Sequence, residues 1–427
     1  MENKFKEEYG MPDPGCLYKW AWSTILLGPG TTNSCHRVGM EDVPLDFGNF
    51  HNTPGKLEDR KKMLNGEWPG RGCEYCRDIE AAGGISDRMD LNNKSPERFI
   101  PIEMKNKKKE IPTNVTPTIV EVYFSNLCNL GCVYCESKFS SVIENEARKY
   151  NLIREEGNAG RVGTDEGYAR RLEQFWAWLK INAKNISRYN ILGGEPFYQP
   201  ELEQNIDFFE EYPCPDLDLV IFSNLKVNKT KFTKILDKTK SLIERKHIKS
   251  LKLLASIDGI GKDEEYVRSG LNMDAWKDNF ELLCRNYPTI LIECHLTMSC
   301  LNVKAMPKLF EFIADMNKLH RNKIHDDNHD YLVWWSLNFV TRPDYMSPNI
   351  FPTGFFDKDF DKMCSFIKVD RDIEMMRGYQ KTVNAGEYNP ELIEKLKEAL
   401  TVLDQRRNTD WKTAFPWLVE FKNEVIE

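Results

Sequence analysis

From residue 119 onward the sequence alternates short apolar runs with amphipathic stretches, and this alternation limits the possible folds more than any other feature. Six runs rich in β-branched and aromatic residues predict strands, at 119–124, 188–192, 217–223, 251–257, 289–298 and 331–340. Stretches with a helical period lie between the runs, at 168–183, 201–212, 231–246, 274–286 and 304–318. The chain therefore repeats a strand-then-helix unit.

Strands separated by helices predict parallel βα units. Six such units favour an α/β fold with a partial (β/α)6 TIM-like barrel over residues 119–345. Residues 1–95 have short elements and predict a small loop-rich module, and 96–118 read as a charged, proline-containing linker. Residues 346–427 predict a helical C-terminal extension, with its clearest helix over 389–407. In folds of this class the functional side chains follow the C-terminal ends of the strands.

Composition is that of a soluble globular chain. Of the 427 residues 41% are hydrophobic and 29% are charged, and the net charge of −7 argues against a protein that coats nucleic acid. The sequence has no apolar run of about 18 residues and no apolar signal-peptide core at its N-terminus. We therefore expect a cytoplasmic protein without a membrane partner.

The twelve cysteines are unevenly distributed. Five are scattered in apolar surroundings and read as small core residues, namely Cys214, Cys284, Cys294, Cys300 and Cys364. The other seven are Cys16, Cys35, Cys73, Cys76, Cys128, Cys132 and Cys135. In a reducing compartment such clustered cysteines predict metal sites rather than disulfides.

The motif SNLCNLGCVYCES (125–137) directly follows the first strand of the repeat and contains Cys128, Cys132 and Cys135. Soft thiolates suit iron–sulfur clusters, and three of them can hold three irons of a cubane. The fourth iron then lacks a protein ligand and can be chelated by a small molecule. A zinc site that lacks one ligand is the alternative, although zinc cysteines usually come in pairs.

With Tyr134 before its third cysteine, this motif resembles the signature of the radical S-adenosylmethionine (radical SAM) enzymes. The resemblance implies that Cys128, Cys132 and Cys135 are catalytic and hold a [4Fe–4S] cluster, with Tyr134 beside the cofactor. S-adenosylmethionine is then reductively cleaved to a 5′-deoxyadenosyl radical, which abstracts hydrogen from a substrate.

The stretch LGGEPF (192–197) follows the second strand and is similar to the family's Gly-Gly-Glu-Pro segment. The resemblance implies that Gly193 and Gly194 permit close approach to the cofactor and that Glu195 accepts from its methionyl ammonium. Ser223 and Asn224 end the third strand and are further candidate cofactor contacts.

The stretch SIDG (256–259) ends the fourth strand. The resemblance assigns Ser256 and Asp258 to the ribose hydroxyls of the cofactor, and Arg268 to its carboxylate. The His-Asp pair that usually precedes this arginine is absent, because Glu265 and Tyr266 stand here.

The N-terminal module, with Cys16, Cys35, Cys73 and Cys76, is similar to the SPASM and twitch extensions of radical SAM enzymes, here placed before the barrel. The resemblance implies a second, auxiliary [4Fe–4S] cluster on these four cysteines. A structural zinc ion on the same residues, or His36 in place of one cysteine, is the alternative.

We expect a peptide or small-molecule substrate and a low-potential electron donor such as flavodoxin or ferredoxin. The basic stretch 225–252 keeps a nucleoside, sugar or nucleic-acid-linked substrate as an alternative, although nucleic acid is not favoured. The rival class is a non-catalytic iron–sulfur protein that transfers electrons or scaffolds partners. That class gives no role to the GGEP and SIDG stretches.

Overall fold

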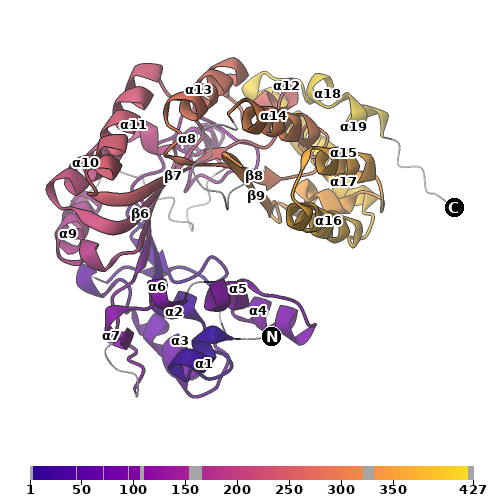
Figure 1. Cartoon of the computed structure of the whole chain (residues 1–427). Helices are drawn as coiled ribbons and strands as arrows, with labels where there is room; N and C mark the ends of the chain where they lie inside the picture. Colours follow the sequence, from indigo (N-terminus) through magenta and orange to yellow (C-terminus); the bar gives the residue numbers. More distant parts are fainter. Residues whose placement is uncertain are drawn as a thin grey trace. The chain divides into compact units, whose positions relative to one another are not determined.

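A computed structural model shows a mixed α/β protein with one mostly parallel sheet (Figure 1). It describes residues 3–44, 46–70, 72–94, 96–105, 110–152, 166–320 and 331–421. The sheet has nine strands in the order β3-β2-β1-β4-β5-β6-β7-β8-β9. The strands are β1 (Trp22–Leu26), β2 (Thr31–Asn33), β3 (Glu41–Asp42), β4 (Ile119–Tyr123), β5 (Arg188–Leu192), β6 (Cys214–Ser223), β7 (Ile248–Ser256), β8 (Leu291–Met298) and β9 (Val333–Phe339).

The strands β4 to β9 confirm the six apolar runs, and the pairs β4–β5, β5–β6, β7–β8 and β8–β9 are parallel as expected. The sequence did not indicate that the N-terminal region joins the same sheet. β1 pairs in parallel with β4, Trp22 lying opposite Ile119, and β2 pairs antiparallel with β1. The α/β class is thus observed, whereas the partial barrel and the expected domain boundaries stay predictions.

The chain forms two compact units, each built from several segments. The first unit comprises Met1–Leu127, Arg148–Ile221 and Asp237–Leu251. The second unit comprises Cys128–Ala147, Phe222–Leu236 and Lys252–Glu427. Each unit is described by itself below.

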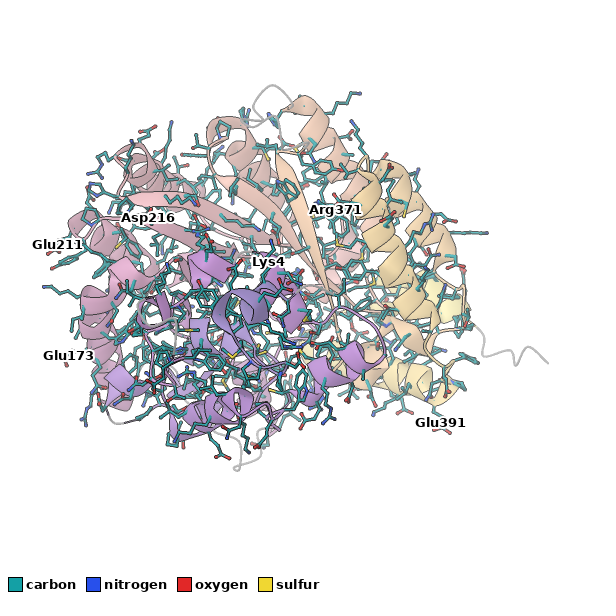
Figure 2. The ribbon with its side chains drawn as sticks, turned by 60° about the horizontal axis from the view of Figure 1, so that its bottom comes forward. Lys4, Glu173, Glu211, Asp216, Arg371 and Glu391 are labelled. Carbon is teal, nitrogen blue, oxygen red and sulfur yellow. The ribbon has the colours of Figure 1, made fainter. Side chains whose placement is uncertain are left out.

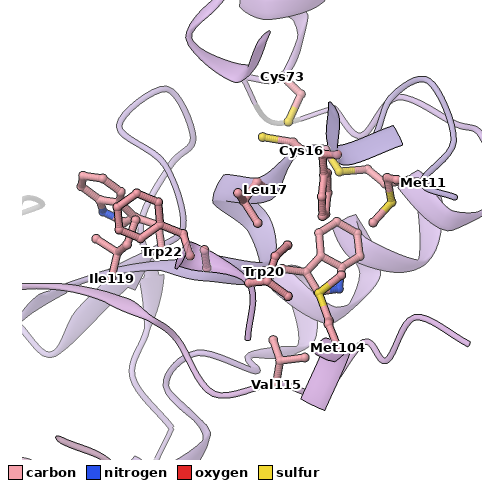
Figure 3. Close-up of a cluster of buried hydrophobic side chains, with 14 residues drawn as sticks. Met11, Cys16, Leu17, Trp20, Trp22, Cys73, Met104, Val115 and Ile119 are labelled. Carbon is pink, nitrogen blue, oxygen red and sulfur yellow. The ribbon is translucent and has the colours of Figure 1, made fainter. Parts of the chain in front are cut away.

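The helices of the first unit begin with a group of short ones and end with two long ones. They are α1 (Lys4–Tyr9), α2 (Leu17–Ala21), α3 (Pro54–Leu64), α4 (Glu74–Ala81), α5 (Asp87–Lys94), α6 (Pro96–Phe99), α7 (Ile102–Lys105), α9 (Glu166–Asn182) and α10 (Pro200–Glu211). The short helices enclose a core in which Leu17 and Trp20 of α2 lie among Met11, Met104 and Val115 (Figure 3). Apolar burial of this kind stabilises the packing of the short helices.

The buried cation Lys56 links several segments of this module. Lys56 Nζ donates to Ser23 Oγ at 3.0 Å, to Thr32 Oγ1 at 2.8 Å and to the Phe50 carbonyl at 3.0 Å. Since buried polar groups must be satisfied, a buried cation with several acceptors can join the segments that supply them. Lys56 thus connects α3 to β1, β2 and the loop before α3.

The outer sides of α9 and α10 are charged. Glu173 and Glu211 project outward in Figure 2. On the inner side, Phe175 of α9 and Phe209 of α10 are fully buried and contact Tyr189 of β5. This amphipathic division is what the 3.6-residue period of the sequence predicts.

One further helix, α11 (Lys229–Glu244), has residues in both units. Two cations of the basic stretch that belong to the first unit, Lys238 and Arg245, pair with α10. Lys238 lies 3.1 Å from Glu203 and 2.8 Å from Asp207, and Arg245 lies 3.0 Å from Glu210. These pairs neutralise part of the positive charge of the stretch 225–252.

The second unit contains α8 (Ser141–Lys149), most of which belongs to it, followed by the C-terminal helices. These are α12 (Lys262–Val267), α13 (Met273–Asn286), α14 (Met306–Leu319), α15 (Asp357–Phe366), α16 (Asp370–Asn384), α17 (Pro390–Arg407), α18 (Trp411–Ala414) and α19 (Pro416–Glu420). Figure 1 shows α15 beside α14, and α16 beside α15. Across the described residues, every helix is too short or too polar to cross a membrane.

The helix α17 confirms the clearest helix expected in the tail. The side chain of Asn389 accepts from the Leu392 amide at its start, and Pro390 occupies its first position. Asn408 ends the helix in the left-handed conformation, with φ 54°. Arg407, at the last position, donates to the Gly131 carbonyl and pairs with Glu146 at 2.7 Å. The tail thereby contacts the loop that contains three of the clustered cysteines.

Candidate functional site

The loop with Cys128, Cys132 and Cys135 is held by hydrogen bonds within the second unit. The Gly131 amide donates to the Ser269 carbonyl at 2.9 Å, and the Val133 amide donates to the Val267 carbonyl at 2.8 Å. The Cys128 amide donates to Ser141 Oγ at 3.1 Å. Since these bonds hold the backbone at Cys128 and at the centre of the motif, the loop keeps a defined conformation.

The three thiols are close enough to affect one another. Burial raises the pKa of Cys132, and the thiols of Cys135 and Cys128 raise it further. Burial and the Cys128 thiol raise the pKa of Cys135 to about 12. Without a cation the thiols of Cys132 and Cys135 keep their protons, and a bound metal would replace those protons.

The four N-terminal cysteines gather in the same way within the first unit. Cys16 precedes α2, and Cys73 and Cys76 lie at the start of α4. In Figure 3 the sulfur atoms of Cys16 and Cys73 point toward each other. Burial raises the pKa of Cys73 to about 11, and its other perturbing groups include Cys35 and Cys76.

A buried cation lies beside these thiols. Lys19 of α2 is 1% exposed, and its Nζ lies 2.6 Å from Asp59 Oδ2. Burial lowers the pKa of Lys19, but Cys73 and Asp59 raise it, with a net increase. His36, the alternative ligand, has a largely exposed side chain that packs edge-on against Trp22.

Both groups have the donor atoms that an iron–sulfur cluster or a zinc ion requires. Even so, in the part of the chain that the structure describes, no three His, Cys, Asp or Glu side chains are arranged to hold a metal ion. The thiols would therefore have to turn toward a common centre. The cysteine ligands are of the type that an iron–sulfur cluster or a zinc ion requires, and the two metal sites stay predictions.

The GGEP stretch of the first unit packs against the residues that precede the cysteine loop. The Gly194 amide donates to the Ser125 carbonyl at 2.9 Å, and the Glu195 amide donates to the Leu127 carbonyl at 2.9 Å. A Cβ on Gly194 would lie 2.4 Å from the Leu127 carbonyl oxygen. The glycine thus permits a close approach to the chain's own backbone just before Cys128.

Gly193 has a φ of 145°, a backbone conformation that residues with a side chain rarely adopt. Glu195 is 1% exposed, and its Oε1 accepts from the Phe197 amide at 3.1 Å. This carboxylate therefore caps the short turn that follows it. Contact of Gly193 and Glu195 with a cofactor stays a prediction.

Asp258 and Arg268, both expected at the cofactor, bind each other in the second unit. Arg268 Nε lies 3.0 Å from Asp258 Oδ2, and Nη2 lies 2.9 Å from Oδ1. The Tyr134 hydroxyl donates to the same carboxylate, as does the Thr297 amide at 2.7 Å. Tyr134, expected beside the cofactor, is thus tied to Asp258, and the three assigned roles toward the cofactor stay predictions.

Glu264, which no sequence motif singled out, completes this cluster. Its Oε1 accepts from the Asp258 amide at 3.0 Å and lies 3.1 Å from Arg268 Nε. Burial and the neighbouring Asp258 raise the pKa of Glu264 well above its ordinary value, although Arg268 lowers it. The four-residue spacing of Glu264 and Arg268 within a helical stretch was the signal that could have revealed the pair.

Ser223 and Asn224 lie beside the cysteine loop. Asn224 Nδ2 donates to Asn129 Oδ1 at 2.9 Å and lies 4.0 Å from Cys128 Sγ. Ser223 is buried, and its Oγ accepts from the Leu225 amide at 3.0 Å. Ser256 ends β7 half-buried, opposite His295 in the register of β7 and β8. The structure therefore brings Asn224 to Cys128, as the strand-end argument predicts.

Comparisons with known proteins add little. No family model matches the chain, and no curated protein matches it. Among solved structures, the chain is similar to the crystal structure of Streptococcus suis SuiB bound to S-adenosylmethionine, at 12% identity and a TM-score of 0.35. The match covers 86% of this chain and 71% of that chain. Similarity at this level is too low to assign a fold or a function.

Proposed function

We propose that this chain is a radical SAM enzyme with an N-terminal auxiliary-cluster module of the SPASM/twitch type and a partial (β/α)6 barrel. One observation supports this most strongly: the C-x3-C-x2-C motif forms a loop after a parallel strand, and hydrogen bonds from the Cys128, Gly131 and Val133 amides hold that loop. A loop after the C-terminal end of a strand is where α/β folds of this class place their chemistry.

In this proposal Cys128, Cys132 and Cys135 hold a [4Fe–4S] cluster, and the arrangement leaves one iron for S-adenosylmethionine. Such a cluster, when bound, supplies the electron that cleaves the sulfonium and yields a 5′-deoxyadenosyl radical. The chain's own residues position the loop. Ser141 holds the Cys128 amide, Ser269 and Val267 hold the motif's centre, and Arg407 fixes the Gly131 carbonyl.

The auxiliary cluster belongs on Cys16, Cys35, Cys73 and Cys76. Lys19 supplies a positive charge beside these thiols, which offsets part of the negative charge of a four-thiolate centre. The substrate is a peptide or small molecule, and the electron donor is a low-potential protein such as a flavodoxin or ferredoxin in the cytoplasm. A nucleoside or sugar substrate is the second candidate, supported by the cationic residues of 225–252.

The test is anaerobic reconstitution with iron and sulfide, followed by S-adenosylmethionine and dithionite. We expect 5′-deoxyadenosine from the wild-type chain. The triple variant Cys128→Ala/Cys132→Ala/Cys135→Ala should form none and lose about four irons per chain. Cys364→Ala, which changes an isolated cysteine of α15, is the matched control and should retain both properties.

Two results would contradict the proposal. Intact clusters without 5′-deoxyadenosine would indicate the rival class, a non-catalytic iron–sulfur protein that transfers electrons or scaffolds partners. Equal iron content in the triple variant and in Cys364→Ala would show that Cys128, Cys132 and Cys135 are not cluster ligands.

A further inference from the structure

A row of polar side chains occupies one face of the sheet in the second unit. The register of β7, β8 and β9 places Ser256 opposite His295, and His295 opposite Ser336. Because side chains alternate along strands, Glu293 and Asn338 lie on this same face. Trp335, on the other face, packs edge-on against Phe310 of α14. The polar row is therefore separate from the helix-packed side of the sheet.

The hydrogen bonds of this row fix the proton positions on His295. The Ser336 hydroxyl donates to Glu293 Oε1, and Glu293 also pairs with Lys252 Nζ. A serine hydroxyl has one proton, so Ser336 Oγ must accept from His295 Nδ1, which lies 2.9 Å away. Neutral His295 thus carries its proton on Nδ1 and leaves the lone pair of Nε2 as an acceptor.

The Asn338 side chain faces that lone pair, its Nδ2 lying 3.4 Å from His295 Nε2. Asn338 is exposed, so a ligand group with a similar N–H or O–H can take its place. The Phe222 ring lies edge-on to His295, with ring centroids 5.3 Å apart. The site around Nε2 therefore offers one acceptor atom beside an aromatic surface.

The surroundings keep His295 neutral. Burial lowers its pKa below the ordinary value, and Arg268 and Lys252 lower it further, against opposite effects of Glu293 and Asp258. Both of those cations are already paired, Lys252 with Glu293 and Arg268 with Asp258 and Glu264. A phosphate or carboxylate would find no unpaired cation among them, whereas a donor group finds a basic nitrogen.

We propose that His295 Nε2 binds, and accepts the proton of, a hydroxyl or ammonium group of the substrate. The substrate O–H or N–H bond breaks, an N–H bond forms on Nε2, and the electron pair stays on the substrate atom. Glu293, acting through Ser336, offsets the charge of the resulting imidazolium. His295 is the catalytic residue here, and Ser336 and Glu293 position it. The inference rests on the proposed function, since it names the substrate class of that enzyme.

The first test uses the full-length chain labelled with 15N-histidine and kept free of iron, so that it does not depend on cluster assembly. NMR should show the His295 resonances, identified by their loss in His295→Asn, with Nδ1 protonated and a pKa below about 6.5. Ser336→Ala should reduce the Nδ1–H tautomer about 3- to 10-fold, as expected for one lost hydrogen bond. Ser336→Thr keeps the hydroxyl and should restore it.

Ser365→Ala, at an exposed serine of α15, is the control for Ser336→Ala. A dominant Nε2–H tautomer in the wild-type chain, or equal tautomer ratios in the two alanine variants, would overturn the proposal. Ethanolamine, which carries a hydroxyl and an ammonium group, should shift the Nε2 resonance, and inorganic phosphate should not. The opposite preference, or no response to ethanolamine, would overturn the substrate class. Failure of the radical chemistry would appear separately, as absent 5′-deoxyadenosine.

Discussion

Arg60 of α3 illustrates how one buried side chain can hold several segments of the N-terminal module together. It is fully buried and donates to the carbonyls of Lys19 at 2.7 Å, Thr113 at 2.6 Å and His51 at 2.9 Å. Burial lowers the pKa of Arg60 to about 9, against the opposing effect of Asp59. The guanidinium fork suits this role because its donors diverge in one plane.

The change Arg60→Met should therefore destabilise the chain strongly. It leaves several buried carbonyls without a donor, and each such group costs about 1–3 kcal/mol. We expect a loss of at least about 3 kcal/mol in the free energy of unfolding, measured by urea denaturation. Arg170→Met, at an exposed position of α9, should change it by less than about 0.5 kcal/mol. Equal effects would show that the carbonyl network contributes no stability.

His51 makes the stability depend on pH. Burial lowers its pKa well below the ordinary value, and the nearby cations Arg60 and Lys56 lower it further. The unfolded chain takes up a proton at His51 near pH 6.5, whereas the folded chain does not. Its contribution to stability is thus fully present above about pH 6.5 and is lost as the pH falls below that value.

Urea denaturation at a series of pH values checks this dependence. The wild-type chain should lose stability as the pH falls below about 6.5. His51→Gln removes the titrating group and should show a shallower pH dependence over the same range. If the free energy of unfolding of His51→Gln depends on pH as strongly as that of the wild-type chain, groups other than His51 cause the pH dependence.

At the scale of elements, the turn between β5 and α10 determines how closely two backbone segments approach. Gly194→Ala places a Cβ 2.4 Å from the Leu127 carbonyl oxygen and 2.5 Å from that of Asn126. Neither backbone atom can rotate away, so these residues, directly before Cys128, must shift. We expect a lower unfolding temperature and a lower iron content after reconstitution.

Gly378→Ala provides the matched control, because this glycine lies inside α16 and a Cβ there meets nothing within 4 Å. Replacing a helical glycine by alanine favours the helix by about 1 kcal/mol. The unfolding temperature of this variant should therefore rise slightly. If both variants behave alike in thermal unfolding and iron content, the close approach at Gly194 is unimportant.

At the scale of the whole molecule, the two cysteine groups lie in different compact units, Cys16 to Cys76 in the first and Cys128 to Cys135 in the second. Each group is held by its own unit's contacts. The two centres should therefore assemble independently, and loss of one set of ligands should leave the other centre in place.

Metal analysis of the reconstituted chain tests this independence. We expect about eight irons in the wild-type chain and about four in Cys16→Ala/Cys73→Ala. That variant should retain S-adenosylmethionine cleavage. About four irons and one zinc in the wild-type chain would instead identify the N-terminal site as a structural zinc site. Loss of all iron in the double variant would contradict independent assembly.

The sequence alone determined the elements whose signal is local. The strands β4 to β9 and the helices α9, α10, α11, α13, α14 and α17 follow periodicity that can be read over short windows. The placement of Cys128, Ser223 and Ser256 at strand ends follows from the same reading, since parallel strands share one end. The groups that these residues would bind are predicted only through the resemblance to the radical SAM enzymes.

Only the tertiary structure decided what depends on partners far apart in the chain. Sequence could not show that β1 pairs with β4, because the pairing joins residues nearly a hundred positions apart. It could not show that Asp258 and Arg268 bind each other, or that Ser336 sets the proton on His295. These contacts depend on strand register and side-chain direction, which local periodicity leaves open.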